Sequence, residues 1–109
     1  MTMAPAPSRA DVVTIHLDDG RFVDGLADVR WLVLGTLHAG ACSLVVDLSG
    51  VQRLPDAAVA VLLWAHRICR ARGGTVVLRG ANRRTLDLLH RTGLERVLQL
   101  EPARGRDVA

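Results

Sequence analysis

Residues 44–78 read LVVDLSGVQRLPDAAVAVLLWAHRICRARGGTVVL, and this stretch decides the fold. Its first part, Leu44–Leu48, is almost entirely apolar, which is typical of a strand buried in a parallel or mixed sheet. Asp56–Ala71 carries apolar residues at helical spacing and predicts a helix. Thr75–Leu78 is a second apolar run and predicts another strand. Strand, helix and strand with short connections form a βαβ unit, which predicts parallel pairing with a right-handed crossover.

The residues before this stretch predict a strand, a turn and a helix. Asp11–Leu17 is rich in β-branched residues and predicts a first strand, and the Asp-Asp-Gly sequence after it predicts a turn. We expect Arg21–Val23 to form a short second strand. Leu26–His38 places apolar residues at helical spacing, with Asp28 in the first turn, and therefore predicts the first helix.

The residues after it predict a third helix. Asn82 belongs to the favoured N-cap types and is placed to begin a helix over Arg83–Thr92. Within this helix, Leu86 and Leu89 are expected to face inward. Gly93 is a typical helix stop, because glycine readily adopts the left-handed backbone conformation found there.

These elements fit one α/β domain. The chain has 109 residues, of which 50% are hydrophobic, and this suffices for a single core without disulfides or metals. With Val97–Leu100 as a last short apolar segment, we expect a mixed sheet of about four or five strands and three or more helices on one or both faces. The domain is expected over residues 11–101, between flexible tails at residues 1–10 and 102–109.

Charge and hydropathy exclude several classes of partner. The net charge is +3, but the 14 basic residues are all arginines spread along the chain, and only 3% of the residues are aromatic. We therefore expect no nucleic-acid partner. No apolar run reaches the roughly 18 residues of a membrane span, so no direct membrane insertion is expected. The first residues lack the features of a secretory signal, which predicts a cytoplasmic location.

No residue pattern predicts catalysis, a metal ion or a cofactor. The four histidines lie on four different predicted elements without HxxxH or HExxH spacing, and Cys42 and Cys69 form no CxxC motif. Ser49 lacks the GxSxG context of a nucleophilic serine. The basic loop Arg79–Arg84, ahead of a helix, is a candidate for holding an anion or a nucleotide phosphate. It lacks the GxxxxGKS/T loop, and the competing interpretation is a set of simply solvated arginines.

Several motifs in order resemble the STAS domain, the fold of the anti-sigma factor antagonists. They are Val45–Val51, then Leu54, then a helix from Asp56, then Arg70–Gly74 before a strand, and finally Leu88–Leu94, a Leu-rich helix ending in Thr-Gly-Leu. Asp11–Ala41 fits the first strands and helix of that family by pattern alone. The resemblance covers nearly the whole chain, with its specific motifs in the second half.

The resemblance implies a small regulatory module that binds a serine-kinase anti-sigma factor and so regulates transcription. In the family, the kinase phosphorylates a serine at the start of the second helix, in an Asp-Ser-Ser-Gly sequence. Here Pro55–Ala58 stands at that place, with Asp56 at the phospho-acceptor position, and no hydroxyl side chain occurs between Val51 and Ala71. Asp56 is then either a permanent mimic of the phosphorylated state or a helix cap.

We expect the partner to bind the connection before the second helix and one stripe of that helix. At about 100° per residue, one stripe of this helix is expected to contain Asp56, Ala60, Trp64 and Arg67. Trp and Arg are favoured interface anchors, although partial core burial is the alternative for Trp64. The stripe expected in the core consists of Ala58, Leu62, Ala65 and Cys69. The predicted partner-binding residues are Arg53, Pro55, Asp56, Ala57, Ala60, Trp64 and Arg67.

Two other functions fit the sequence less directly. A STAS subunit of a larger assembly, such as a membrane-transport complex, also needs no phosphorylatable serine. An enzyme or ligand carrier ranks last, because no convergent set of polar residues is recognisable. The sequence carries no motif that predicts an oligomeric state.

Overall fold

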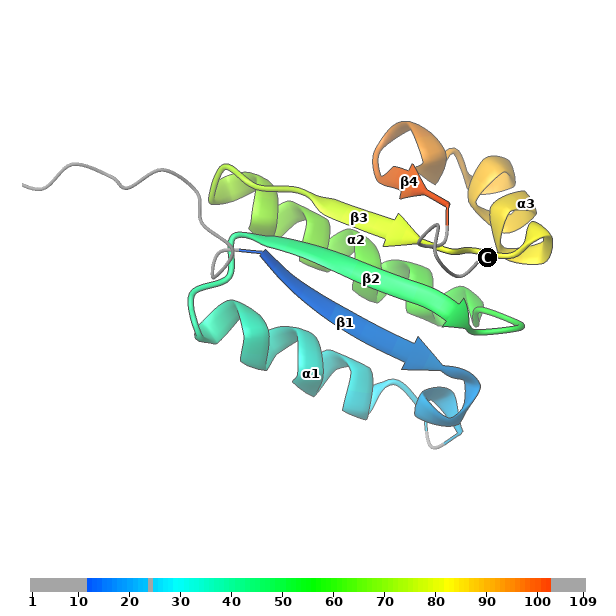
Figure 1. Cartoon of the computed structure of the whole chain (residues 1–109), viewed down its shortest axis with the longest axis horizontal. Helices are drawn as coiled ribbons and strands as arrows, with labels where there is room; N and C mark the ends of the chain where they lie inside the picture. Colours follow the sequence, from blue (N-terminus) through cyan, green and yellow to red (C-terminus); the bar gives the residue numbers. More distant parts are fainter. Residues whose placement is uncertain (1–11, 24, 103–109) are drawn as a thin grey trace, which may run out of the picture.

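The computed structural model describes residues 12–23 and 25–102, which form one α/β domain with a layer of helices on a β-sheet (Figure 1). The elements in chain order are strand β1 (Val12–Asp18), 3-10 helix η2 (Asp19–Phe22), helix α1 (Ala27–His38), strand β2 (Ser43–Gly50), helix α2 (Asp56–Ala71), strand β3 (Val76–Arg79), helix α3 (Arg83–Thr92), 3-10 helix η3 (Leu94–Arg96) and strand β4 (Gln99–Glu101). The α/β fold class predicted from the sequence is confirmed. The predicted tails lie almost wholly outside the described residues.

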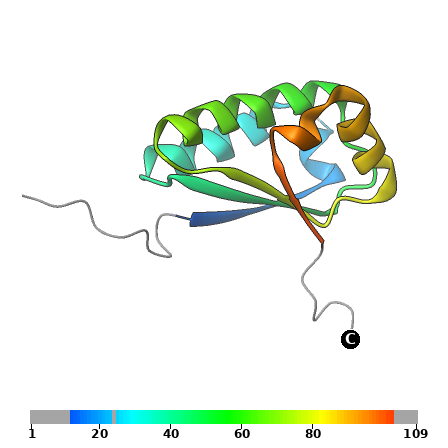
Figure 2. The same cartoon turned by 90° about the horizontal axis from the view of Figure 1, so that it is seen from above.

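The described strands form one parallel sheet in the order β1-β2-β3-β4. One row of the register joins Ile15, Val46, Leu78 and Leu100. Each crossover steps to the next strand in the same direction, and right-handed crossovers then place every helix on the same side of the sheet. Figure 2 shows this arrangement, with the helices above the sheet and its other face open. The sheet expected from the sequence was mixed, and this is wrong for the described strands, because the connection between each strand and the next contains a helix or helical turn that returns the chain to the same end of the sheet. Of the two arrangements left open for the helices, the described helices cover one face.

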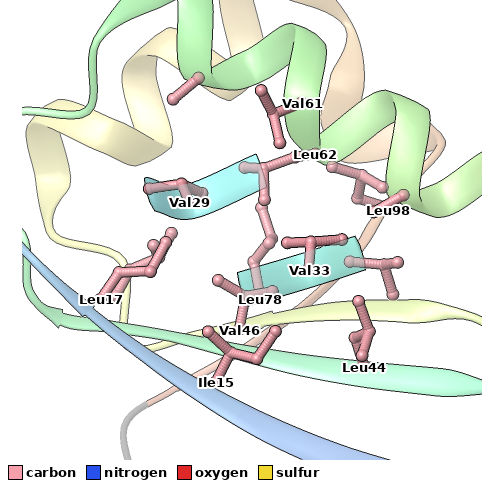
Figure 3. Packing of buried hydrophobic residues seen from close by; sticks show 14 of the residues in the cluster. Ile15, Leu17, Val29, Val33, Leu44, Val46, Val61, Leu62, Leu78 and Leu98 are labelled. Carbon is pink, nitrogen blue, oxygen red and sulfur yellow. The ribbon is translucent and has the colours of Figure 1, made fainter. Parts of the chain in front are cut away.

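The core lies between the sheet and the helices. The strand residues that face the helices are Ile15 and Leu17 of β1, Leu44, Val46 and Leu48 of β2, and Val76 and Leu78 of β3, all buried. Figure 3 shows Ile15 and Val46 beneath Val29 and Val33 of α1, with Leu62 reaching down from α2. Burial of such side chains contributes about 1.5–3 kcal/mol each relative to full exposure. This packing fixes which faces of the helices remain on the surface.

Local sequence signals set the helix ends much as expected. α2 begins at Asp56 after Pro55, which is extended at φ −62° and ψ 145°. α3 begins after Asn82, whose Oδ1 accepts a hydrogen bond from the Thr85 N–H at 2.9 Å. Gly93 ends α3 in the left-handed conformation at φ 77°. The predicted N-cap and helix stop of α3 are therefore confirmed.

Two local predictions are wrong. Arg21–Val23 is not a strand, because the Asp18 carboxylate accepts a hydrogen bond from the Arg21 N–H at 3.2 Å and the chain turns into η2. Leu86 does not face inward but is 42% exposed. Thr85 takes the buried position instead, because it lies one helical turn from the buried Leu89 on the same face of α3. Of the last apolar segment, Val97 and Leu98 lie between η3 and β4, and the rest enters the short strand β4.

Candidate functional site

The candidate site lies where α2 and α3 begin, at the carboxyl ends of neighbouring strands. β2 and β3 are adjacent and parallel, so the connections that leave them meet at one edge of the sheet. The first connection leads through residues 51–55 into α2, and the second leads through residues 80–82 into α3. In α/β sheets this edge is the usual place for ligand and partner contacts.

Two side chains hold the connection before α2 in place. The Asp19 carboxylate accepts hydrogen bonds from the backbone N–H groups of Gln52 at 3.0 Å and Arg53 at 3.4 Å. From the other side, the Asn82 amide donates to the carbonyl oxygens of Gln52 at 3.0 Å and Val51 at 3.4 Å. The connection is thus fixed between η2 and the start of α3. Sequence reasoning identified Asn82 only as a cap and assigned Asp19 only to a turn.

The two stripes predicted on α2 are separated in space. Most of the predicted partner-binding residues are exposed, while Pro55 and Trp64 are half-buried. The exposed ones are Arg53, Asp56, Ala57, Ala60 and Arg67. The predicted core stripe is buried at all four positions, Ala58, Leu62, Ala65 and Cys69. Val61 and His66 add to the buried face, so α2 buries more than one row.

Trp64 is shared between the core and the surface. Its ring packs against the edge of the hydrophobic core, and the Arg30 guanidinium of α1 lies 5.7 Å from the ring centroid. This distance is within the range of a cation–π interaction. The other tryptophan, Trp31, is 71% exposed on α1. Sequence reasoning did not single it out, although Val29 and Val33 mark the buried face of α1 and Trp31 lies off that face.

Asp56 is the first residue of α2, and Pro55 holds the N-cap position without a side-chain hydrogen bond. In the part of the chain that the structure describes, no backbone N–H donates to the Asp56 carboxylate. Its effect on the helix therefore comes from the positive end of the helix dipole, a contribution of about 0.3–1 kcal/mol at an exposed site. The exposed Asp56 is also one of the residues that line a cavity.

This cavity, of about 480 Å³, lies between the start of α2 and one face of α3. It is lined by Arg53, Leu54, Pro55, Asp56, Arg84, Thr85, Leu88 and Arg91. It combines a polar rim of three arginines and one carboxylate with apolar walls from Leu54 and Leu88. Within residues 12–23 and 25–102, none of these three guanidinium groups forms an ion pair. Arg84 was expected only as part of the basic loop, and Leu54, Thr85, Leu88 and Arg91 were not among the predicted site residues.

A second group of charges crosses the open face of the sheet, at the register positions of His16, Asp47, Arg79 and Glu101. Here the charges are paired, with His16 Nδ1 3.7 Å from Asp47 Oδ2 and Arg79 Nε 3.3 Å from Glu101 Oε1. The Ser49 N–H also donates to Asp47 Oδ1 at 2.8 Å.

The surroundings of Asp47 act on its pKa in opposite directions. Burial alone raises the pKa of this carboxyl. Hydrogen bonds from Ser49, together with the charges of His16 and Arg79, outweigh burial and hold that pKa below its ordinary value. Asp47 therefore stays ionised as part of the paired row.

Histidine, cysteine and carboxylate side chains are the possible metal ligands of the chain. Across the described ranges, no three His, Cys, Asp or Glu side chains gather to hold a metal ion. Cys42 and Cys69 are free thiols, and burial raises the pKa of Cys69. Among the helices that the structure describes, none is long and apolar enough to cross a membrane.

Comparisons with known proteins agree on the fold. The family model described as "Mlab, STAS domain" matches residues 6–100. The NMR structure of the protein TM1081 is similar with a TM-score of 0.75 and 19% identity, over 94% of this chain and 83% of that chain. The crystal structure of a candidate anti-sigma factor antagonist from Thermotoga maritima, tm1081, has a TM-score of 0.72 and 16% identity, over 90% of this chain and 85% of that chain. No curated protein matches the chain.

Proposed function

The chain belongs to the STAS domain family, and from this premise we propose that it is a protein-binding regulatory module of the anti-sigma factor antagonist type. Its partner would be an anti-sigma factor of the serine-kinase type. The proposed binding surface, here called the α2 surface, consists of Arg53, Pro55, Asp56, Ala57, Ala60, Trp64 and Arg67.

The observation that carries this proposal is the contrast between the two sides of α2. Ala57 and Ala60 leave the first turns of the helix exposed and free of bulky side chains, so a partner can approach the backbone closely. Arg53 on one side and Trp64 on the other supply side chains of the types enriched at interface centres. The fixed connection 51–55 keeps the surface in one conformation, which lowers the entropic cost of binding.

The proposed surface differs from the family pattern at the phosphorylation site. Asp56 takes the place of the phospho-acceptor serine, and no serine, threonine or tyrosine occurs from Val51 to Ala71. The carboxylate places one permanent negative charge at the start of α2, whereas a phosphoserine would place about −1.5 to −2 there. We infer that binding is not switched by phosphorylation at this helix start.

Affinity purification of the tagged chain from its native cells, followed by identification of the bound proteins, tests the proposal. We expect recovery of an ATP-binding anti-sigma factor of the serine-kinase type. Ala60→Arg should abolish this recovery, because a long charged side chain would fill the exposed stripe. Ala71→Arg is the matched control, since Ala71 is exposed at the other end of the same helix.

The same experiment separates the alternative function. Recovery of membrane-transport components instead of a kinase-type protein would make the chain a subunit of a larger assembly and contradict the antagonist role. Asp56→Ser and Ala57→Ser add a second readout, because each restores a hydroxyl at the start of α2. Phosphorylation of either variant by the recovered partner would support the family-type orientation of the complex.

A further inference from the structure

We propose that the N-terminal residues 3–7, Met-Ala-Pro-Ala-Pro, bind in an apolar groove between α1 and the start of β1, with their prolines against the ring of Trp31. The groove has a volume of about 310 Å³, and Val13, Trp31, Gly35 and Ala39 are among the residues that line it. It shares no lining residue with the α2 surface or with the cavity between α2 and α3. The inference therefore stands whether or not the α2 surface binds a protein.

Helix α1 carries apolar side chains on more than the face that packs on the sheet. Val29, Val33 and Leu37 form its buried face. Trp31 and Leu34 lie off that face and are 71% and 38% exposed. A helix that is apolar on several sides is normally covered on several sides. In the part of the chain that the structure describes, the outer side of α1 is left uncovered.

Gly35 provides an independent sign that another chain lies against α1. It stands in the interior of the helix, where glycine is less stable than alanine by about 1 kcal/mol. A Cβ atom added at Gly35 would meet no atom of the described residues within 4 Å, its own helix backbone aside. Packing among these residues therefore does not require a glycine. Together with the exposed Ala39, it leaves the helix backbone open to the close approach of another chain.

The position of the groove favours the N-terminal segment as its occupant. α1 runs antiparallel to β1, so its last residues lie beside the start of β1 (Figure 1). Val13, the second residue of β1, lines the groove at this end, and Trp31 lies roughly 12 Å further along α1 than Ala39. In a polyproline II conformation, residues 8–11 span about 12 Å and residues 3–7 about 15 Å. The segment before β1 is thus long enough to reach the groove and to extend along it.

The composition of the segment matches the groove. Residues 1–8 read MTMAPAPS and contain no charged side chain. Pro5 and Pro7 restrict the backbone and favour the polyproline II conformation. Such segments bind grooves lined by aromatic side chains at a low entropic cost. A volume of about 310 Å³ is at the small end of ligand sites, so the groove suits a few small side chains and not the surface of a folded partner.

NMR spectroscopy of the isotope-labelled full chain tests the proposal directly. We expect nuclear Overhauser effects between the indole protons of Trp31 and the ring protons of Pro5 and Pro7. The methyl and amide shifts of residues 3–7 should also differ from those of a synthetic peptide of residues 1–11.

Two variants should release the segment. Gly35→Leu fills the groove, and it should fold normally because leucine favours a helix and its Cβ meets open space. Trp31→Ala removes the ring while leaving the groove open. In each variant the Overhauser effects should disappear, and the shifts of residues 3–7 should move to the peptide values. His38→Leu is the matched control for Gly35→Leu, since it places the same side chain on an exposed position of α1 outside the groove, and it should change neither readout.

The other outcomes contradict the proposal. Peptide-like shifts for residues 3–7 in the unmodified chain would show that the segment does not bind the fold. Overhauser effects that persist in Gly35→Leu would place the segment outside the groove. Effects at Trp31 that arise only between differently labelled molecules, and that grow with protein concentration, would assign the groove to a second copy of the chain. None of these results depends on the protein partner, so failure here and failure of the proposed function are distinguishable.

Discussion

The open face of the sheet and the cavity between α2 and α3 both carry charged side chains, but they use them differently. On the sheet, the His16 imidazole lies beside the Asp47 carboxylate and the Arg79 guanidinium lies beside the Glu101 carboxylate, so both carboxylates have a basic neighbour. At the cavity, three arginines line the walls without an ion-pair partner among residues 12–23 and 25–102. In the described fold, the charged side chains on the open face of the sheet have partners, whereas the three arginines of the cavity have none.

This difference indicates where the molecule makes contacts with other molecules. Charges that are paired across strands contribute modestly to stability, about 0–1 kcal/mol for each exposed pair. Unpaired charges on a fixed scaffold contribute little to folding and are available for a ligand or partner. The proposed partner binding therefore belongs to the end of the sheet where α2 and α3 begin, and not to its open face.

The largest effect is expected from removing the side chain that holds the cavity together. Asn82→Ala removes both the cap of α3 and the hydrogen bonds to the connection before α2. We expect a loss of about 1–2 kcal/mol in the free energy of unfolding, measured by urea denaturation, because loss of an N-cap costs about this much.

Asn82→Ser is the control for that experiment. Serine can still cap α3 but cannot reach the carbonyl oxygens of the connection with an amide. It should therefore retain most of the stability that Asn82→Ala loses. If Asn82→Ala unfolds at the same urea concentration as the unmodified chain, neither the cap nor the hydrogen bonds to the connection stabilise the fold.

A smaller effect is expected on the open face. Asp47→Asn should lower the free energy of unfolding by less than about 1 kcal/mol at pH 7, because it breaks a partly exposed charge network. The pKa of Asp47 is lowered in the folded state, so its stabilising effect is present above the unfolded pKa of about 3.9 and is lost as the pH falls through the folded pKa. The difference between the unmodified chain and Asp47→Asn should shrink in urea denaturation below about pH 4. A difference that grows at acid pH would contradict the paired arrangement.

The smallest effect on stability is expected at the cavity arginines. Arg84→Gln and Arg91→Gln should change the free energy of unfolding by less than about 0.5 kcal/mol, because neither residue has an ion-pair partner in the described fold. Thermal denaturation of both variants checks this. A loss larger than that of Asp47→Asn would mean that these arginines serve the fold, and it would remove the contrast between the two regions.

Features that depend on local sequence could be predicted, and features that depend on distant contacts could not. The limits of α2 follow from its apolar period and from Pro55, and the cap at Asn82 is a local chemical signal. The Asp19 carboxylate, however, reaches backbone groups 33 residues further along the chain, which no local pattern reveals.

The residues that line the cavity could not be grouped from the sequence either, because they come from distant parts of the chain. Its arginines stand in the sequence as scattered basic residues, and only the packing of α3 against the start of α2 brings Arg84 and Arg91 near Arg53. The choice of Thr85 over Leu86 as the buried residue of α3 also depends on how that helix lies on the sheet. The basic loop identified from the sequence contributes Arg84 to the cavity.

The most direct test of the central claim is the dissociation constant of the purified chain for its recovered protein partner, compared between variants on the two regions. Ala60→Arg places a bulky charge on the α2 surface, and Thr14→Arg places the same side chain on the open face of the sheet, where Thr14 is exposed. We predict that Ala60→Arg weakens binding at least about 100-fold, the loss of one interface hot spot, while Thr14→Arg leaves it unchanged. Loss of binding in Thr14→Arg with normal binding in Ala60→Arg would place the interface on the open face and contradict the account.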